Sequence, residues 1–193
     1  MALKHMAVEV RIATIQDAEQ IQKIYAPYVE NSAITFEYDA PDVEEIRKRM
    51  TEKMQKFPWL VAIEDDLVVG YAYAGTFKAR AAYDWSVETS IYVRCDIRTK
   101  GIGRALYEEL ERILQKMGIT NLNACVAYTE EDTPWLTQGS IRFHEKLGFR
   151  QVGVFKQCAY KFDRWWDMCW FEKHIGEHKA NTPAVVPFPE LKL

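Results

Sequence analysis

Residues 85–118 read WSVETSIYVRCDIRTKGIGRALYEELERILQKMG, and they carry the strongest structural signal in the chain. The run 85–93 is the most β-prone stretch and is expected to be a strand. The second half places apolar residues at the helical period, and Gly118 is a natural C-terminal stop for a helix. Gly101 and Gly103 lie between the two segments. The stretch therefore predicts a strand, a glycine-containing turn and an amphipathic helix.

The other segments surround this unit with strands and helices in the order β-α-α-β-β-β-α-β-α-β-β. The expected strands cover residues 8–13, 59–63, 67–73, 85–93, 122–127, 149–155 and 160–173, with a short β-prone segment at 34–38, and the expected helices cover about 18–28, 41–55, 102–117 and 140–147. This order predicts an α/β fold in which a predominantly antiparallel sheet meets a strand-helix-strand crossover.

Length and charge limit the class of protein. The chain has 193 residues, 48% of them hydrophobic, and a formal net charge of −3. This size fits one domain, which we place at residues 7–176. We interpret residues 1–6 as a cloning remnant or a native extension, and the proline-containing residues 177–193 as a C-terminal tail. The acidic balance argues against nucleic-acid or membrane partners, and no apolar run approaches the roughly 20 residues of a membrane helix.

The cysteines and histidines argue against a metal site and against a disulfide framework. The four cysteines are widely spaced, without a Cys-x-x-Cys pair, and no two of the four histidines lie four residues apart on an expected helix. We expect the cysteines to be buried thiols in a reducing cytoplasm. They are Cys95, Cys125, Cys158 and Cys169.

The turn before the long helix has the properties of an anion site. A strand that leads through a glycine-containing turn into a helix directs free backbone N–H groups and the positive end of the helix dipole to one point. Gly101 and Gly103 allow close approach of a phosphate, while Arg98, Lys100 and Arg104 add positive charge. A turn with solvated basic residues is the alternative interpretation.

Two common nucleotide-binding motifs do not match this turn. A Rossmann fingerprint requires a small residue where Leu106 stands, and a Walker loop requires Gly-Lys-Ser/Thr where residues 103–105 read Gly-Arg-Ala. What remains, Arg98-x-x-Gly101-x-Gly103, resembles the R/Q-x-x-G-x-G/A pyrophosphate loop of the GNAT N-acetyltransferases. The resemblance implies the GNAT fold, a mixed and mostly antiparallel sheet flanked by helices, and acetyl-CoA as co-substrate. It assigns to the cofactor Arg98, Thr99, Lys100, Gly101, Ile102, Gly103 and Arg104.

Further blocks resemble one branch of these enzymes, the phosphinothricin N-acetyltransferase family. The most specific block is KARAAYDWSVE at residues 78–88; others are ITFE at 34–37, FPWLVA at 57–62, GYAYAG at 70–75, SIRFHEKLGF at 140–149 and residues 153–166. Together they cover about residues 8–175. The resemblance implies direct transfer of acetyl from acetyl-CoA to the primary amine of phosphinothricin, methionine sulfoximine or methionine sulfone in a ternary complex. By analogy we expect a homodimer.

The same resemblance assigns the catalytic groups. Glu88 matches the family's proposed general base, which takes a proton from the attacking amine. His144 stands where many GNAT enzymes have a tyrosine and would protonate the departing CoA thiolate. The backbone N–H groups of Ile91, Tyr92 and Val93 would stabilise negative charge on the attacked carbonyl. The alternatives are a carboxylate on a half-buried strand and a histidine that only packs on a short helix.

Binding residues follow from the resemblance as well. Thr137 stands where the family pattern often has an asparagine, three residues before Ser140, and the loop at 129–138 looks longer than usual. We expect both side chains at the cofactor. Lys78 and Arg80 would bind the anionic ends of the acceptor, although a solvated loop is the alternative for both. The remaining acceptor residues are expected to be Tyr83 and Tyr160 as hydrogen-bonding groups and Phe36 and Glu37 as the wall.

Two other functions remain open from the sequence. The same fold could acetylate a polyamine, an aminoglycoside or a protein N-terminus, since composition does not distinguish these acceptors. A non-catalytic acyl-CoA-binding module is the second possibility, favoured by the departure at Thr137 and opposed by Glu88 and the intact glycine loop.

Overall fold

The computed structural model describes residues 8–97 and 101–192, in which seven strands form one sheet of order β1-β2-β3-β4-β5-β7-β6. The strands are β1 (Glu9–Ile12), β2 (Trp59–Glu64), β3 (Leu67–Thr76), β4 (Ser86–Val93), β5 (Asn121–Tyr128), β6 (Arg150–Lys161) and β7 (Arg164–His174). The helices are α1 (Ala18–Asn31), α2 (Val43–Met54), α3 (Ile102–Met117) and α4 (Gly139–Lys146), with short 3-10 turns η1 (Ile15–Asp17), η2 (Ala81–Tyr83) and η3 (Phe188–Glu190). The predicted α/β order is confirmed.

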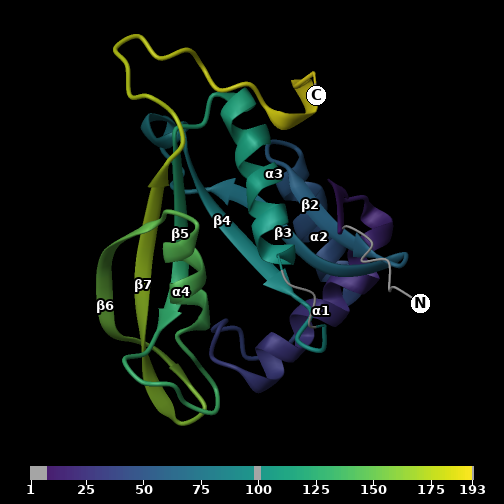
Figure 1. Cartoon of the computed structure of the whole chain (residues 1–193), viewed down its shortest axis with the longest axis vertical. Coiled ribbons are helices and arrows are strands. Elements are labelled where there is room, and N and C mark those ends of the chain that lie inside the picture. The colour runs from purple at the N-terminus through teal and green to yellow at the C-terminus, as the bar shows by residue number, and fades with distance from the viewer. Residues whose placement is uncertain (1–7, 98–100, 193) are drawn as a thin grey trace, which may run out of the picture.

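The pairing between β4 and β5 is parallel and short. It joins Ser86 to Asn121 and ends where Glu88 lies beside Asn123, whereas β3 remains paired with β4 up to Val93. Beyond Glu88 the two strands diverge (Figure 1). The edge of β4 that faces β5 therefore opens into a cleft, which is where the predicted crossover begins.

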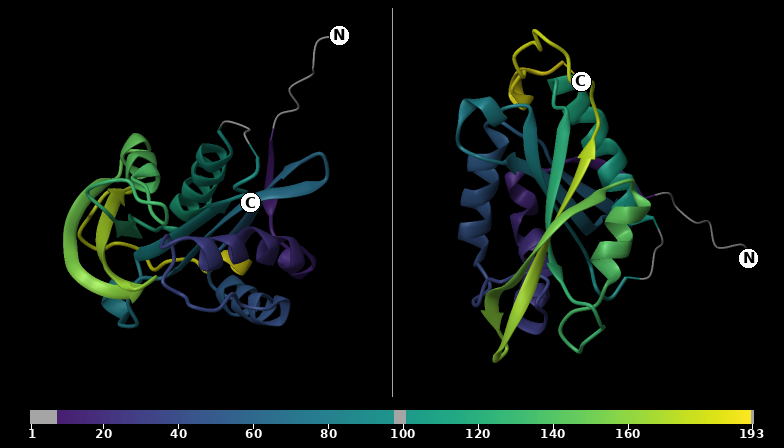
Figure 2. Two further views of the ribbon diagram at one scale, coloured as in Figure 1. Left: turned by 90° about the horizontal axis from the view of Figure 1, so that it is seen from below. Right: turned by 90° about the vertical axis from the view of Figure 1, so that its left-hand side faces the viewer.

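Helices cover both faces of the sheet. Figure 2 shows α3 and α4 on one face and α1 and α2 on the other. The apolar stripe of α3, including Leu106 and Leu110, is fully buried against the central strands. Ile21 of α1 and Met50 of α2 are buried on the opposite face. Each such side chain contributes about 1.5–3 kcal/mol of burial free energy, so both faces hold the central strands in place.

The segment at residues 34–38 is a loop, and the expectation of a β-prone segment there is wrong. The ammonium of Lys161, a buried residue, donates hydrogen bonds to the carbonyls of Val29, Ser32 and Thr35 at 2.7, 2.9 and 2.9 Å. The N–H of Ala33 donates to the Trp135 carbonyl at 2.9 Å. These bonds hold the end of α1 and the start of the segment in place without a strand neighbour.

Two further expectations are corrected by the structure. The last strand begins at Arg164 and not at Tyr160, because Phe162 and Asp163 adopt positive φ values of 54° and 56° and form the turn that ends β6. Of the four cysteines only Cys169 is buried, and the other three, Cys95, Cys125 and Cys158, are exposed. Cys125 lies on β5 beyond Asn123, where the pairing with β4 ends, and its exposure follows from the opening between the two strands.

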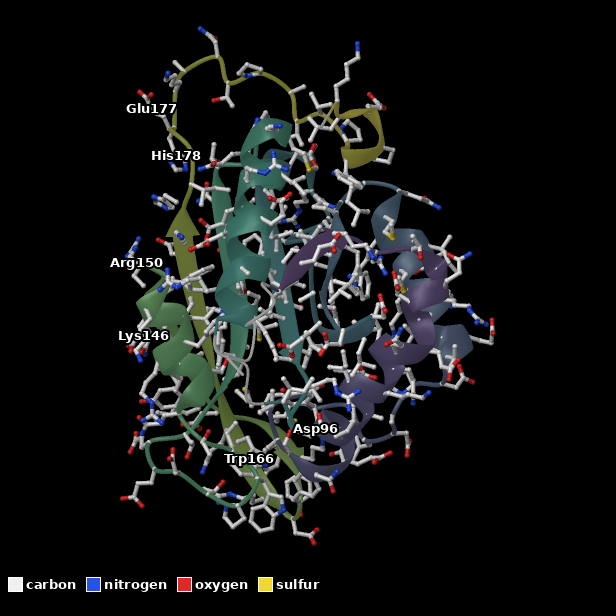
Figure 3. All side chains as sticks on the ribbon, turned by 45° about the vertical axis from the view of Figure 1, so that its right-hand side comes forward. Asp96, Lys146, Arg150, Trp166, Glu177 and His178 are labelled. Atoms are coloured by element: carbon white, nitrogen blue, oxygen red, sulfur yellow. The ribbon has the colours of Figure 1, made fainter. Side chains whose placement is uncertain are left out.

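The C-terminal segment docks on the domain. It starts beyond the end of β7, where Glu177 and His178 lie (Figure 3), and returns over the C-terminal end of α3. The N–H of Val186 donates to the Met117 carbonyl at 2.9 Å, and the Trp85 indole donates to the Pro183 carbonyl at 2.7 Å. Within residues 8–97 and 101–192, no helix is long and apolar enough to cross a membrane.

Candidate active site

The cleft between β4 and β5 continues into two adjoining cavities. The smaller, of about 60 Å³, lies between the diverging strands and reaches His144. The larger, of about 460 Å³, runs between the end of β4 and the first turns of α3 and α4. The residues that line the larger cavity are Tyr28, Ile34, Ile91, Tyr92, Val93, Gly101, Ile102, Gly103, Arg104, Gly139, Ser140, Phe143, Lys146 and Leu147. Ser140 and Ile34 also line the smaller one.

The glycine turn borders the larger cavity. Gly101 precedes α3 with φ of +96°, a backbone conformation that side-chain-bearing residues rarely adopt. The first backbone bond of α3 runs from the Ala105 N–H to the Gly101 carbonyl at 2.9 Å. The N–H groups of residues 101–104 consequently have no acceptor within the helix. Of the predicted loop, Arg98, Thr99 and Lys100 lie outside the described residues.

Gly103 also has a packing role, which the sequence did not predict. A Cβ at this position would lie 2.9 Å from Cε2 of Phe143. Gly103 therefore allows α3 and α4 to approach closely, in addition to bordering the cavity. Arg104 forms an exposed ion pair with Glu108 at 3.4 Å, one turn further along α3.

Glu88 lies half-buried on β4, at the point where β4 leaves β5. Its partner in the β3–β4 register is Gly75, on β3. Burial raises the pKa of the Glu88 carboxyl above its ordinary value, and the charges of Lys53 and Lys78 oppose this shift. A raised pKa makes the carboxylate a better proton acceptor. Lys53, on α2, was not predicted as a site residue.

His144 is buried on α4, with 4% of its surface exposed, and both ring nitrogens have partners. Nδ1 lies 2.8 Å from the Ser140 carbonyl, and Nε2 lies 3.2 Å from the hydroxyl of Tyr107. Burial lowers the pKa of the imidazole, so the ring is neutral at neutral pH. Tyr107 was also missed by sequence reasoning, because its hydroxyl is carried on the buried face of a helix.

The predicted acceptor residues fall into two groups. Lys78 and Tyr83 lie near Phe77 beside the cleft: the Lys78 ammonium is 4.9 Å from the Phe77 ring centroid, and the Tyr83 ring is 6.0 Å from it. The Lys78 ammonium also lies 5.5 Å from the ring centroid of Trp170, which pairs with β5. Arg80 is exposed and precedes η2.

The second group lies along the loop at 34–38 and on the β6–β7 hairpin. Glu37 accepts hydrogen bonds from Arg49 at 2.8 and 3.2 Å and from the Tyr25 hydroxyl at 2.9 Å. Phe36 packs against the buried Trp166, which Figure 3 places near the lower end of the molecule. Tyr160 is exposed on β6, and its carbonyl accepts from the Tyr38 hydroxyl. Neither Tyr160 nor Thr137 lines the two cavities described above.

Comparison with known proteins identifies the family to which this chain belongs. The family model of the acetyltransferase (GNAT) domain matches residues 10–170. The chain belongs to the GNAT acetyltransferases. It is 31% identical over 191 residues to the phosphinothricin N-acetyltransferase of Streptomyces viridochromogenes, covering 99% of this chain and 100% of the relative. This places the acetyltransferase in the phosphinothricin N-acetyltransferase family.

Other relatives agree on the fold and the chemistry. The L-methionine sulfoximine/L-methionine sulfone acetyltransferase of Salmonella typhimurium is 28% identical, with 89% of this chain and 96% of the relative covered. The crystal structure of a phosphinothricin acetyltransferase from Sinorhizobium meliloti in complex with acetyl-CoA superposes with a TM-score of 0.84 and 32% identity, covering 96% of this chain and 97% of that one. The protein is an acetyl-CoA-dependent N-acetyltransferase.

The residues of the acetyltransferase fit acetyl-CoA. The unpaired N–H groups of residues 101–104 are the donors that a pyrophosphate requires, and they border a cavity of about 460 Å³. Ile91, Tyr92 and Val93 line the same cavity from β4. Bound acetyl-CoA supplies a thioester-activated acetyl group. Among the described residues, no group of three or more His, Cys, Asp or Glu side chains is arranged to hold a metal ion.

Proposed function

We propose that the enzyme acetylates the primary amine of a small amino acid or analogue, such as phosphinothricin, methionine sulfoximine or methionine sulfone, by direct attack in a ternary complex. The observation that carries this proposal is the position of Glu88. This half-buried carboxylate lies where β4 and β5 separate, with the charges of Lys53 and Lys78 acting on it. An acceptor held by cations at this point presents its amine to a base beside the thioester cavity.

Glu88 takes the proton that the ammonium form of the acceptor must lose before attack, directly or through a water. The edge of β4 beyond Glu88 is not paired with β5, and the backbone N–H groups of Ile91 and Val93 face this edge, because the N–H groups that alternate with them bond to β3. These two groups stabilise the charge that develops on the attacked oxygen. His144 lines the smaller cavity and donates a proton to the sulfur of the departing CoA. Because burial lowers the pKa of His144, the neutral ring must take up this proton in the ternary complex before it passes the proton to the sulfur.

The cofactor is held by Arg98, Thr99, Lys100 and residues 101–104, with Ser140 at the junction of the two cavities and Thr137 in the preceding loop. The larger cavity supports this assignment for Gly101, Ile102, Gly103, Arg104 and Ser140. The acceptor is held by Lys78, Arg80 and Tyr83, with Phe36, Glu37 and Tyr160 contributing from the opposite side. For Lys78 and Tyr83 the support is their position around Phe77 beside the cleft.

We further propose that the enzyme is a homodimer. The β6–β7 hairpin carries an exposed apolar surface, in which Val152, Phe155 and Trp165 are each 57% exposed and Tyr160 is 44% exposed. The ring centroids of Tyr160 and Trp165 lie 5.3 Å apart, and several exposed apolar side chains on one hairpin are typical of an interface. Sedimentation velocity measures the oligomeric state: a dimer supports this proposal, and a monomer at micromolar concentration contradicts it.

The biological setting is part of the same proposal. Four free cysteines suit the reducing cytoplasm, where a small amine is the partner rather than a nucleic acid or a membrane. Acetylation of phosphinothricin would block its amine and confer herbicide or antibiotic resistance. Growth of a sensitive host on phosphinothricin, with and without the expressed enzyme, tests this role.

The acceptor assignment is tested by measuring CoA release from acetyl-CoA with a panel of amines. The panel contains phosphinothricin, methionine sulfoximine, methionine sulfone, free amino acids, spermidine, an aminoglycoside and an alanine-starting peptide. Saturable turnover on the first three supports the proposal. Turnover only on spermidine, the aminoglycoside or the peptide overturns the acceptor class, and no turnover with retained acetyl-CoA binding points to the non-catalytic module.

A further inference from the structure

The helix α2 directs Lys53 across the sheet toward Glu88. Lys53 lies in the last turn of α2, and its ammonium is 5.2 Å from the ring centroid of Tyr73 on β3. Tyr73 pairs with Ser90, two residues beyond Glu88 on β4. The Lys53 side chain therefore extends over the ends of β3 and β4, on the face that carries Glu88, where its charge acts on that carboxyl.

Gly75 makes room for this arrangement. It lies opposite Glu88 in the β3–β4 register, and a Cβ there would be 3.1 Å from the Lys53 ammonium. Because the ammonium is the free end of a flexible side chain, a methyl group at position 75 would move it by only a few tenths of an ångström. The contact places the ammonium over the backbone of β3 beside the proposed base.

No ion pair among the described residues neutralises the charge of Lys53. One turn earlier on α2, Arg49 is neutralised by Glu37 and Glu45, each with an oxygen at 2.8 Å. Among the described residues, Lys53 makes no ion pair, and its contact is with the face of Tyr73. Within the part of the chain that the structure describes, Lys78 likewise makes no ion pair, and its ammonium lies over the rings of Phe77 and Trp170.

Two unpaired ammonium groups thus act on Glu88, one from α2 and one from the loop after β3. Together with Arg80, these cations exceed the single negative charge of Glu88 by two. The α-carboxylate of an acceptor amino acid offsets one of the two charges, and a second anion on the side chain would offset the other. The aromatic rings beneath both ammonium groups hold them in place without neutralising them.

We propose that Lys53 is a specificity-determining residue that binds the anionic end of the acceptor side chain, so that the enzyme prefers amino acids whose side chain ends in an anion, such as a phosphinate or carboxylate, over those with a neutral sulfone. Lys78 and Arg80 bind the α-carboxylate. This inference rests on the proposed acceptor class.

The test compares two acceptors that share the amine and the α-carboxylate. Phosphinothricin has an anionic side chain and methionine sulfone a neutral one. Lys53→Met is expected to raise the KM for phosphinothricin about tenfold and to change the KM for the sulfone by less than about twofold, while any change in kcat through the pKa of Glu88 is the same for both acceptors. Lys53→Arg should restore the wild-type ratio. Lys48→Met, which removes an exposed lysine from the same helix, is the matched control.

The outcomes separate this inference from the proposed function. If wild-type enzyme turns over neither acceptor, the proposed function fails, and the inference fails with it. If wild-type enzyme turns over both but Lys53→Met weakens them equally or leaves both unchanged, the inference alone is overturned. Unchanged acetyl-CoA affinity and thermal midpoint in Lys53→Met show that the variant is folded.

Discussion

The Nε2 atom of His144 lies 3.2 Å from the hydroxyl of Tyr107, and that hydroxyl lies 3.0 Å from Oγ1 of Thr89 on β4. A buried chain of polar groups therefore connects the smaller cavity to the core beneath the site. With the Nδ1–H of His144 donating to the Ser140 carbonyl, Nε2 is the acceptor and the Tyr107 hydroxyl the donor. The Ser140 carbonyl thus fixes the tautomer, and the Tyr107 hydroxyl helps to fix the orientation of the ring.

Tyr107→Phe should lower kcat about tenfold, because it removes one buried hydrogen bond that orients His144. The KM values for acetyl-CoA and for the acceptor should change little, since Tyr107 lines neither cavity. Steady-state kinetics at saturating concentrations of both substrates measures the effect. A folded Tyr107→Phe enzyme with wild-type kcat would remove Tyr107 from the mechanism.

The buried imidazole of His144 should also make the free energy of unfolding depend on pH. Burial lowers the pKa of His144 below its ordinary value of 6.5, so the unfolded chain takes up a proton that the folded chain resists. The free energy of unfolding should therefore fall as the pH drops below about 6.5, until the folded pKa is passed.

Urea unfolding of wild type and His144→Phe at pH 7.5 and 5.5 isolates this contribution. The wild-type protein should lose more stability than the variant between the two pH values, because only the wild type carries the titrating ring. Equal losses would show that His144 titrates alike in the folded and unfolded states.

Gly103→Ala should destabilise the contact between α3 and α4. Its Cβ would lie 2.9 Å from the Phe143 ring, and relief of such overlap in a packed site costs about 1–3 kcal/mol. Because Gly103 and Phe143 both line the larger cavity, acetyl-CoA affinity should fall as well. Thermal unfolding and calorimetric titration measure the two effects.

Gly103→Ala combined with Phe143→Leu is the companion variant, since leucine removes the ring edge that the new methyl group would meet. Partial recovery of both stability and affinity is expected. A single variant with wild-type stability and affinity would contradict the proposed reason for glycine at this position.

Local sequence patterns were sufficient for most of the fold. The apolar period of residues 102–117 and the β-prone run at 85–93 predicted α3 and β4, because both patterns depend on neighbours in sequence. The segment at 34–38 was wrongly assigned, since the group that holds it, Lys161, is more than 120 residues away. Local propensity contains no information about such a partner.

The candidate site was only partly predictable for the same reason. The glycine turn was predicted as an anion site from the local sequence, and Glu88 and His144 came from the family resemblance. Lys53 and Tyr107 lie on helix faces that the sequence does not relate to the cleft. Lys53 approaches Glu88 only after α2 packs across the sheet and Gly75 leaves space for it. Such positions follow from tertiary packing and need the structure.

The role of Glu88 is decided by the turnover of Glu88→Gln. CoA release with phosphinothricin at neutral pH and acetyl-CoA affinity by titration are measured on wild type and variant together. Loss of the base should lower kcat by about 10²–10⁴ while the affinity for acetyl-CoA stays unchanged, because Glu88 lines neither cavity. Near-wild-type turnover by the folded variant would contradict base catalysis by Glu88 in this cleft.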